Sequence, residues 1–176
     1  MTFTLVLGGM RSGKSQFAAE LANQAGGRVA VVATGLASDE EMQERIELHR
    51  RCRPAEWALY EEPVEIGGVV PAGSAETILL DSVDGWLGSR LDPESCLVQV
   101  RALRERAASV IAVTSEVGLS LVALTPAGRA FTDALGTVNQ QLAAEADRVY
   151  LVVAGLPLAL KIQMEGKNDV HGRERE

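Results

Sequence analysis

Residues Gly8–Ser15 read GGMRSGKS and match the pattern G-x-x-x-x-G-K-[ST]. That pattern indicates a phosphate-binding loop when a strand precedes it and a helix follows it. The apolar run Phe3–Leu7 predicts the strand, and the segment Lys14–Gln24 is compatible with the helix. Glycines allow successive backbone N–H groups to turn toward a phosphate, and the amino end of the helix adds positive potential. The stretch therefore predicts a nucleotide-binding loop, against the alternative of a glycine-rich turn that happens to contain Lys-Ser.

The side chains of this loop have separate predicted roles. Lys14 would bring a mobile positive charge to the β- and γ-phosphates, and Ser15 would offer a hydroxyl to Mg²⁺. The whole loop is expected to hold the phosphates, so the candidate residues are Gly8, Gly9, Met10, Arg11, Ser12, Gly13, Lys14 and Ser15.

A metal-binding carboxylate is expected at the end of another buried strand. Residues Thr77–Asp81 read TILLD, four apolar or β-branched residues followed by an acid. This is the usual shape of a Walker B strand, whose carboxylate holds Mg²⁺ directly or through water. Two alternatives remain open, because Asp81 could simply cap a turn and Asp84 is a nearby competitor.

Apolar runs recur along the chain and alternate with segments that are compatible with helices. Because the runs are continuous rather than alternating, they indicate strands that are covered on both faces. The order of elements predicts an α/β domain with a mainly parallel sheet flanked by helices. The expected strands are Phe3–Leu7, Val29–Ala33, Thr77–Leu80, Val110–Val113 and Val149–Val153, and the expected helices are Lys14–Gln24, Asp39–Arg51, Pro93–Ala108 and Ala127–Ala146.

Two further stretches are harder to assign. The segment Ala55–Gly73 could contain a short strand near Trp57–Tyr60 and a short helix after Pro63. The apolar stretch Val149–Ile162 is shorter than a bilayer crossing and contains Gly155 and Pro157, so buried strands explain it better.

Composition limits the classes of function. The 176 residues suit one domain over residues 1–163, and the charged residues 164–176 predict a flexible tail. A net charge of −7 argues against broad binding to nucleic acid, which depends on Lys and Arg. Cys52 and Cys96 form no CxxC pair, and the amino terminus has no basic region typical of a signal peptide. We therefore expect a cytoplasmic protein.

The block RIELHRRCRP, residues 45–54, places His49 among arginines. Such a gathering of positive charge indicates an anion, for which a phosphate is the natural candidate. Neighbouring cations also favour the neutral imidazole, which can attack phosphorus. The alternative is a basic cluster that complements the negative end of a helix.

Together these segments resemble the bifunctional adenosylcobinamide kinase and adenosylcobinamide-phosphate guanylyltransferase family of cobalamin assembly. The resemblance runs from Leu5 to Lys161, and its most specific part is RI-x-x-H-x-x-x-RP after an ATG strand end. The other segments that carry it are GGMRSGKS, VVATG, TILLDSVDGWL, SEVG and GTVNQQLAAEADRVYLVVAGLPLALK.

The resemblance implies a RecA-like P-loop fold, often assembled as a trimer, and two reactions. A nucleoside triphosphate, ATP or GTP, would phosphorylate adenosylcobinamide, and His49 would then carry GMP from GTP to the new phosphate. The resemblance also implies that the nucleotide, with its Mg²⁺, is contacted by Ala33, Thr34, Gly35, Arg50, Arg51, Cys52, Arg53, Glu61 and Asp81.

Several alternatives stay open at this point. Glu61 could be a solvated surface acid beside Glu62. The chain could be a P-loop small-molecule kinase without the guanylyl step, or a nucleotide-binding regulator without catalysis. This sequence also departs from the family in SEVGLSLVALTP, where Ser120 stands in place of a usual glycine, so the loop after Glu116 bears on substrate preference.

Overall fold

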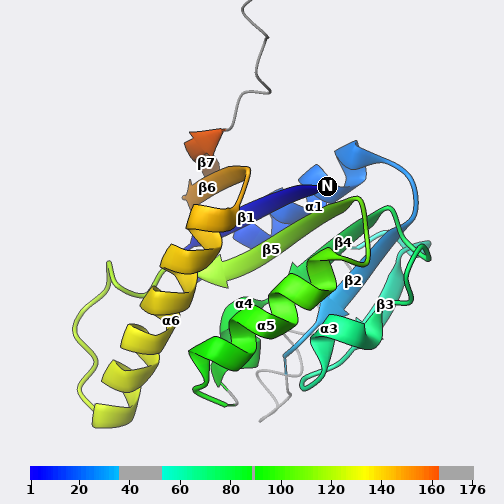
Figure 1. Cartoon of the computed structure of the whole chain (residues 1–176). Coiled ribbons are helices and arrows are strands. Elements are labelled where there is room, and N and C mark those ends of the chain that lie inside the picture. Colours follow the sequence, from blue (N-terminus) through cyan, green and yellow to red (C-terminus); the bar gives the residue numbers. More distant parts are fainter. Residues whose placement is uncertain (36–52, 89, 163–176) are drawn as a thin grey trace, which may run out of the picture.

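The structure, a computed structural model, describes residues 1–35, 53–88 and 90–162. Its described part contains a seven-stranded sheet in the order β3-β2-β4-β5-β1-β6-β7 (Figure 1). All neighbouring strands are parallel except β6 and β7, which form an antiparallel hairpin. The strands are β1 Thr2–Gly8, β2 Val29–Ala33, β3 Ala58–Glu61, β4 Thr77–Asp81, β5 Ser109–Ser115, β6 Arg148–Val153 and β7 Leu156–Ile162. The predicted α/β class with a mainly parallel sheet is confirmed.

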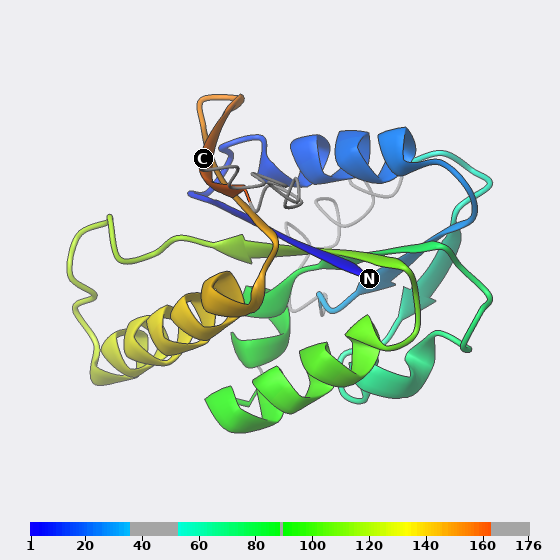
Figure 2. The ribbon, with the colours of Figure 1, turned by 45° about the horizontal axis from the view of Figure 1, so that its top comes forward.

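Helices cover both faces of the sheet. Figure 2 shows α1 on one face and α5 with α6 on the other. Helices α5 and α6 begin in the same way, because each has Pro at its first position and a capping side chain, Asp92 for α5 and Thr125 for α6. The described helices are α1 Lys14–Ala25, α3 Ile66–Val69, α4 Val83–Gly88, α5 Pro93–Arg104 and α6 Pro126–Glu145.

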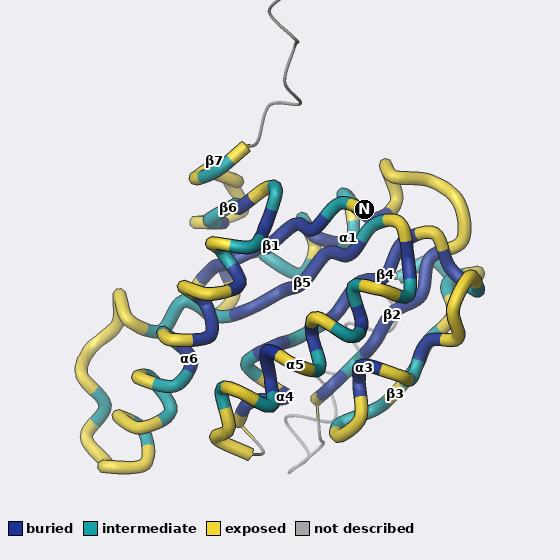
Figure 3. Tube along the Cα trace, in the orientation of Figure 1, coloured by how far each residue is buried: buried dark blue, intermediate teal, exposed yellow. Residues whose placement is uncertain are grey.

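The core lies in two layers, one on each side of the sheet. Along β1, Leu5 and Leu7 belong to the layer under α5 and α6, whereas Val6 belongs to the layer under α1. This alternation follows from the period of two in a strand. The central strands are therefore buried on both faces, as Figure 3 shows by their dark blue trace.

The register of the parallel strands brings their carboxyl ends to one edge. Gly8 at the end of β1 pairs with Ser115 of β5, and Asp81 of β4 pairs with Val113 of β5. On the other side of β4, Ala33 pairs with Asp81 and with Glu61 of β3. The loops that leave these strands thus start side by side.

Several details differ from the sequence-based expectations. Helix α5 ends at Arg104 rather than Ala108, because the chain must turn before β5 begins with Ser109 donating to the carbonyl of Glu76. Helix α4 was not expected, and the segment Ala55–Gly73 does contain β3 and α3.

The prediction that Val149–Ile162 forms buried strands is wrong for its second half. Strand β7 lies at the edge of the sheet, and nearly all its residues are exposed. An apolar run cannot by itself distinguish a covered strand from an apolar edge strand. Among the described residues, no helix is long and apolar enough to span a membrane.

Two other expectations fall outside the described residues. They are the helix Asp39–Arg51 and the flexible tail over residues 164–176.

Glu145 joins the end of α6 to α5. Its carboxylate accepts from Arg101 at 2.6 Å and from Arg104 at 2.7 Å. The hydrogen bond from Arg101 is the main reason that the pKa of Glu145 is lowered, and the nearby charges of both arginines add to the effect. The charged form of Glu145 therefore stabilises the packing of these two helices.

The variant Glu145→Gln should lower the free energy of unfolding at pH 7 by about 0.5–1 kcal/mol, as expected for a partly exposed charge cluster. Because the pKa is lower in the folded state, this contribution is complete above the unfolded carboxyl pKa of about 4.3 and is lost as the pH falls through the lowered value. Urea unfolding at pH 7 and at more acidic pH should show the gap between wild type and variant closing. Glu105→Gln is the control, and a gap that stays constant on acidification would contradict the prediction.

Candidate functional site

The loop Gly8–Ser15 joins β1 to α1 and is shaped by close backbone packing. A Cβ atom at Gly8 would lie 2.4 Å from the Ser12 hydroxyl oxygen and 2.8 Å from the carbonyl oxygen of Val152. Gly13 has a φ of 92°, in the left-handed region that favours glycine. Both motif glycines are therefore required by the geometry of the loop itself.

The loop also presents groups that suit an anion. Lys14 donates from its ammonium group to the carbonyl of Gly9 at 3.2 Å, so its charge lies over the loop. The hydroxyl of Ser12 is buried and has no hydrogen-bond partner among the described residues. We call the loop Gly8–Ser15 the cradle. It lies at the start of α1, a 12-residue helix whose amino end favours phosphate.

Ser15 and Asp81 meet beside this loop, although 66 positions separate them. The Ser15 hydroxyl lies 3.4 Å from Oδ1 of Asp81. A hydroxyl and a carboxylate are the hard oxygen ligands that Mg²⁺ prefers, and Mg²⁺ usually completes its shell with water and substrate phosphates. No group of three His, Cys, Asp or Glu side chains in the described ranges could hold a metal without such help. The pair therefore fits a magnesium ion that arrives with a nucleotide.

Arg53 reaches the same carboxylate from the other side. Its guanidinium lies 2.6 Å from Oδ2 of Asp81, and the side chains of the two residues are only 13% and 10% exposed. A charge pair this buried leaves a costly uncompensated charge if either partner is removed. Arg53, near the end of the block RIELHRRCRP, is thus anchored on Asp81, the predicted Walker B acid.

Asp84, the competing acid of the sequence analysis, has a different partner. It accepts from the backbone N–H of Ser115 at 3.1 Å and from the Ser115 hydroxyl at 2.8 Å. Among the described residues, Asp81 is therefore the acid beside Ser15, and Asp84 fixes the end of β5. Sequence reasoning missed this role because it depends on the contact between α4 and β5.

The end of β2 contributes Ala33, Thr34 and Gly35. Thr34 is buried, and its hydroxyl donates to the carbonyl of Ser82 at 2.6 Å and accepts from the Ser82 N–H at 3.0 Å. Its side chain is therefore occupied in bracing β4. Glu61 lies at the exposed end of β3 in register with Ala33, on the same edge as Asp81.

The predicted nucleophile and its neighbours fall outside the described residues. These are His49, Arg50, Arg51 and Cys52. The other cysteine, Cys96, is buried in α5, and burial raises the pKa of its thiol to about 12, with a smaller contribution from Asp92. Cys96 is therefore a packed thiol and not a nucleophile.

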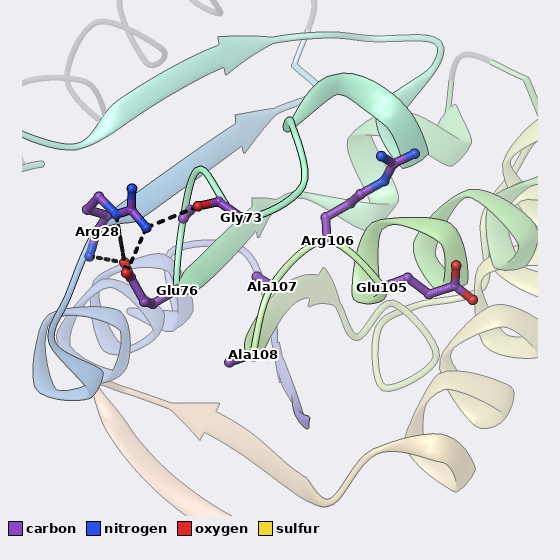
Figure 4. Close-up of a pocket in the computed structure, with 8 residues that line it drawn as sticks. Arg28, Gly73, Glu76, Glu105, Arg106, Ala107 and Ala108 are labelled. Atoms are coloured by element: carbon purple, nitrogen blue, oxygen red, sulfur yellow. Dashed lines mark hydrogen bonds and ion pairs between the residues drawn. The ribbon is translucent and has the colours of Figure 1, made fainter.

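Away from this site, a hollow of about 260 Å³ lies at the opposite end of the parallel strands, beside the residues that precede β2, β4 and β5. Figure 4 shows Arg28 and Glu76 facing each other there, joined at 2.9 Å. Arg28 also donates to the carbonyl of Gly73, and Arg106 donates to that of Gly67. Arg28 and Arg106 in this hollow are thus already bonded to groups of the protein. The loop Gly8–Ser15, at the carboxyl ends of the strands, is therefore the better candidate for binding a phosphate.

Comparison with known proteins assigns this site to a family. Residues 4–160 match the family described as cobinamide kinase / cobinamide phosphate guanyltransferase. The chain belongs to this family. The match covers the cradle, the block around His49 and the Walker B acid.

Individual relatives agree with the family. The bifunctional adenosylcobalamin biosynthesis protein CobP of Pseudomonas aeruginosa is 38% identical over 167 residues, covering 89% of this chain and 96% of that protein. The bifunctional adenosylcobalamin biosynthesis proteins CobU of Escherichia coli and of Salmonella typhimurium are each 35% identical over 179 residues, covering 89% of this chain and 98% of theirs.

One solved structure supports the fold alone. It was described as a prototypical ATPase from the type III secretion system of pathogenic bacteria, with a TM-score of 0.52 and 12% identity. The match covers 90% of this chain and 56% of that chain. A P-loop NTPase fold for this member of the cobinamide kinase / guanyltransferase family is thus supported by sequence and by structure.

The two adjacent glycines of the cradle give a matched test of its packing. Gly8→Ala should lower the free energy of unfolding by about 1–3 kcal/mol, the usual cost of forcing an extra methyl group into a packed site. Gly9→Ala should change it by less than about 0.5 kcal/mol, because no described atom lies within 4 Å of a Cβ at Gly9. Thermal unfolding without nucleotide measures both. Equal stability of the two variants would show that the close approach at Gly8 is not a constraint.

Proposed function

We propose that this protein is a bifunctional cytoplasmic enzyme of cobalamin biosynthesis. It phosphorylates adenosylcobinamide with ATP or GTP, and it then transfers GMP from GTP to adenosylcobinamide phosphate. Membership of the family supports both activities, since its relatives are named bifunctional adenosylcobalamin biosynthesis proteins. The cradle Gly8–Ser15 with Asp81 supports the use of a nucleoside triphosphate.

In the first reaction, the cradle orients the triphosphate so that its terminal phosphorus faces the acceptor. The alcohol oxygen of adenosylcobinamide forms a bond to the γ-phosphorus, and the bond from that phosphorus to the bridging oxygen breaks. Lys14 offsets negative charge on the transferred group and on the leaving diphosphate. Ser15 and Asp81 would hold Mg²⁺, which would supply further charge neutralisation.

In the second reaction, His49 would act as a temporary carrier. A neutral ring nitrogen attacks the α-phosphorus of GTP, and pyrophosphate leaves with the electrons of the broken P–O bond. A phosphate oxygen of adenosylcobinamide phosphate then attacks the histidine-bound phosphorus. The P–N bond breaks, and the product is adenosylcobinamide-GDP.

The contact between Arg53 and Asp81 is the observation that carries this assignment. Arg53 closes the block RIELHRRCRP only four residues after His49. Four residues span at most about 14 Å even when extended, so the anchoring of Arg53 on Asp81 is compatible with a carrier role for His49 at the same site. The arginines of the block would then offset the charge of the triphosphate.

The carrier role is tested with GTP labelled at the α-phosphorus. Wild type with Mg²⁺ should acquire label that is stable to alkali and labile to acid, and His49→Ala should acquire none. His171 is the only other histidine of the chain, so His171→Ala is the matched control and should label fully. His49→Ala should keep transfer of the γ-phosphate to adenosylcobinamide, because that step does not use the imidazole. Full labelling of His49→Ala would disprove the carrier role and leave only the kinase.

We also propose that the protein is a homo-oligomer, a trimer by the family resemblance. An exposed apolar row on β7 supports contact with a second copy: Leu156, Leu158, Leu160 and Ile162 are 74%, 58%, 57% and 55% exposed. They lie on the last strand of the described sheet, where one row of backbone groups has no neighbouring strand. Such an edge favours association with another chain.

The double variant Leu158→Glu/Leu160→Glu should shift the protein to the mass of one chain, because charges would be buried without partners in the contact. Light scattering after size-exclusion chromatography measures the mass. Val98→Glu is the control, since Val98 is also 55% exposed but lies on α5. A monomeric wild type, or an oligomer that survives the double variant, would refute this contact.

A further inference from the structure

The end of β5 lies between the two halves of the nucleotide site. Strand β5 is the only strand between β1, which leads into the cradle, and β4, which ends in Asp81, in the sheet that the structure describes. Gly8 pairs with Ser115, so the next residue, Glu116, leaves the sheet beside the cradle. In loops of this kind, the terminal phosphate of a triphosphate lies near the lysine, here Lys14, and near the residues that would hold Mg²⁺, here Ser15 and Asp81. Glu116 therefore begins the loop that borders the reacting end of the nucleotide.

Three hydrogen bonds fix the backbone from which Glu116 projects. The Ser115 N–H donates to Asp84, and the Ser115 carbonyl accepts from the side-chain amide of Asn139 at 3.0 Å. The N–H of Glu116 itself donates to the carbonyl of Gly8 at 3.1 Å. Helices α4 and α6 and the cradle thus hold this short segment from three directions. A reactive group on such a support is held in position before the substrate arrives.

The carboxylate of Glu116 is held by one of its two oxygens only. Its Oε1 accepts from the N–H of Gly118 at 2.7 Å, whereas Oε2 has no hydrogen-bond partner among the described residues. A Cβ at Gly118 would lie 3.0 Å from Oε1, so the glycine leaves room for the carboxylate. One oxygen is therefore anchored, and the other remains free to accept a proton.

Glu116 lines a cleft of about 370 Å³ next to the cradle. One wall is the first half of the cradle, Gly9–Ser12, and another is the loop at Leu119 and Ser120. Part of its rim is apolar, because the side chains of Met10 and Leu119 line the cleft and are 77% and 81% exposed. An apolar rim around one carboxylate suits a large amphipathic molecule that presents a hydroxyl group.

We propose that Glu116 is the general base of the kinase reaction and that this cleft receives the acceptor alcohol. The inference rests on the proposed function, which supplies both the triphosphate and the alcohol of adenosylcobinamide. Oε2 of Glu116 takes the proton of the alcohol as its oxygen bonds to the γ-phosphorus. The bond from that phosphorus to the bridging oxygen breaks, and the electron pair leaves with the nucleoside diphosphate. The guanylyl step does not use Glu116, since its nucleophiles are a neutral imidazole and an ionised phosphate.

Glu116→Gln is the decisive variant, because an amide oxygen can still accept from Gly118 but the side chain cannot take a proton. Its kcat for γ-phosphate transfer to adenosylcobinamide should fall about 10²-fold or more, as expected for loss of a general base. Labelling of the protein by α-labelled GTP should stay at the wild-type level. Glu116→Asp should retain part of the kinase activity, and Glu105→Gln, at the distant end of α5, should retain all of it.

Leu119→Ser tests the cleft separately from the base. It should raise the KM for adenosylcobinamide several-fold with little change in kcat or in the KM for the triphosphate. A kinase rate of Glu116→Gln within threefold of wild type would overturn the inference, as would a parallel loss of kinase and guanylyl labelling. If wild type labels with GMP but never phosphorylates adenosylcobinamide, the proposed kinase function fails and the inference falls with it.

Discussion

Parallel register among β1, β5 and β4 is the constraint on which the site depends. It places Gly8, Ser115 and the end of TILLD along one edge, so that a hydroxyl and a carboxylate 66 positions apart lie within 3.4 Å. Parallel strands have evenly spaced hydrogen bonds, and a slip of one residue would turn every side chain to the opposite face. Because both faces of these strands are buried, such a slip would expose the core. Packing of the core therefore fixes the geometry of the phosphate site.

The polar contacts around this edge form two separate supports. One is the ion pair of Arg53 with Asp81, which balances a buried carboxylate and anchors the block that contains His49. The other is the pair of hydrogen bonds at Ser115, whose N–H donates to Asp84 and whose carbonyl accepts from Asn139, and it fixes the start of the loop after β5. The first support serves the nucleotide and the proposed carrier, and the second serves the proposed acceptor cleft. Two reactions at one nucleotide site would thus use opposite sides of the same sheet edge.

Local sequence signals predicted much of this arrangement, and their failures have identifiable physical causes. The bounds of β2 were correct, and α1 was missed by only one residue, because strong apolar runs and the glycine motif mark these elements. The end of α5 was missed because it is set by the turn into β5. The exposure of β7 was missed because the same apolar letters describe a covered strand and an edge strand. The different partners of Asp81 and Asp84 could not be read from TILLDSVD, since both acids lie within three residues of the end of the same strand.

The sequence by itself predicted a phosphate-binding loop at Gly8–Ser15, and it determined that strands and helices alternate and which family the chain resembles. These properties depend on local patterns and on a motif whose spacing is fixed by the covalent chain. Only the tertiary structure decided that Asp81 faces Ser15 and Arg53, that Asp84 holds Ser115, and that Glu116 lines a cleft beside the cradle. Each of these contacts joins residues from different strands and helices, so it exists only after the register of the sheet and the packing of the helices have brought distant segments together.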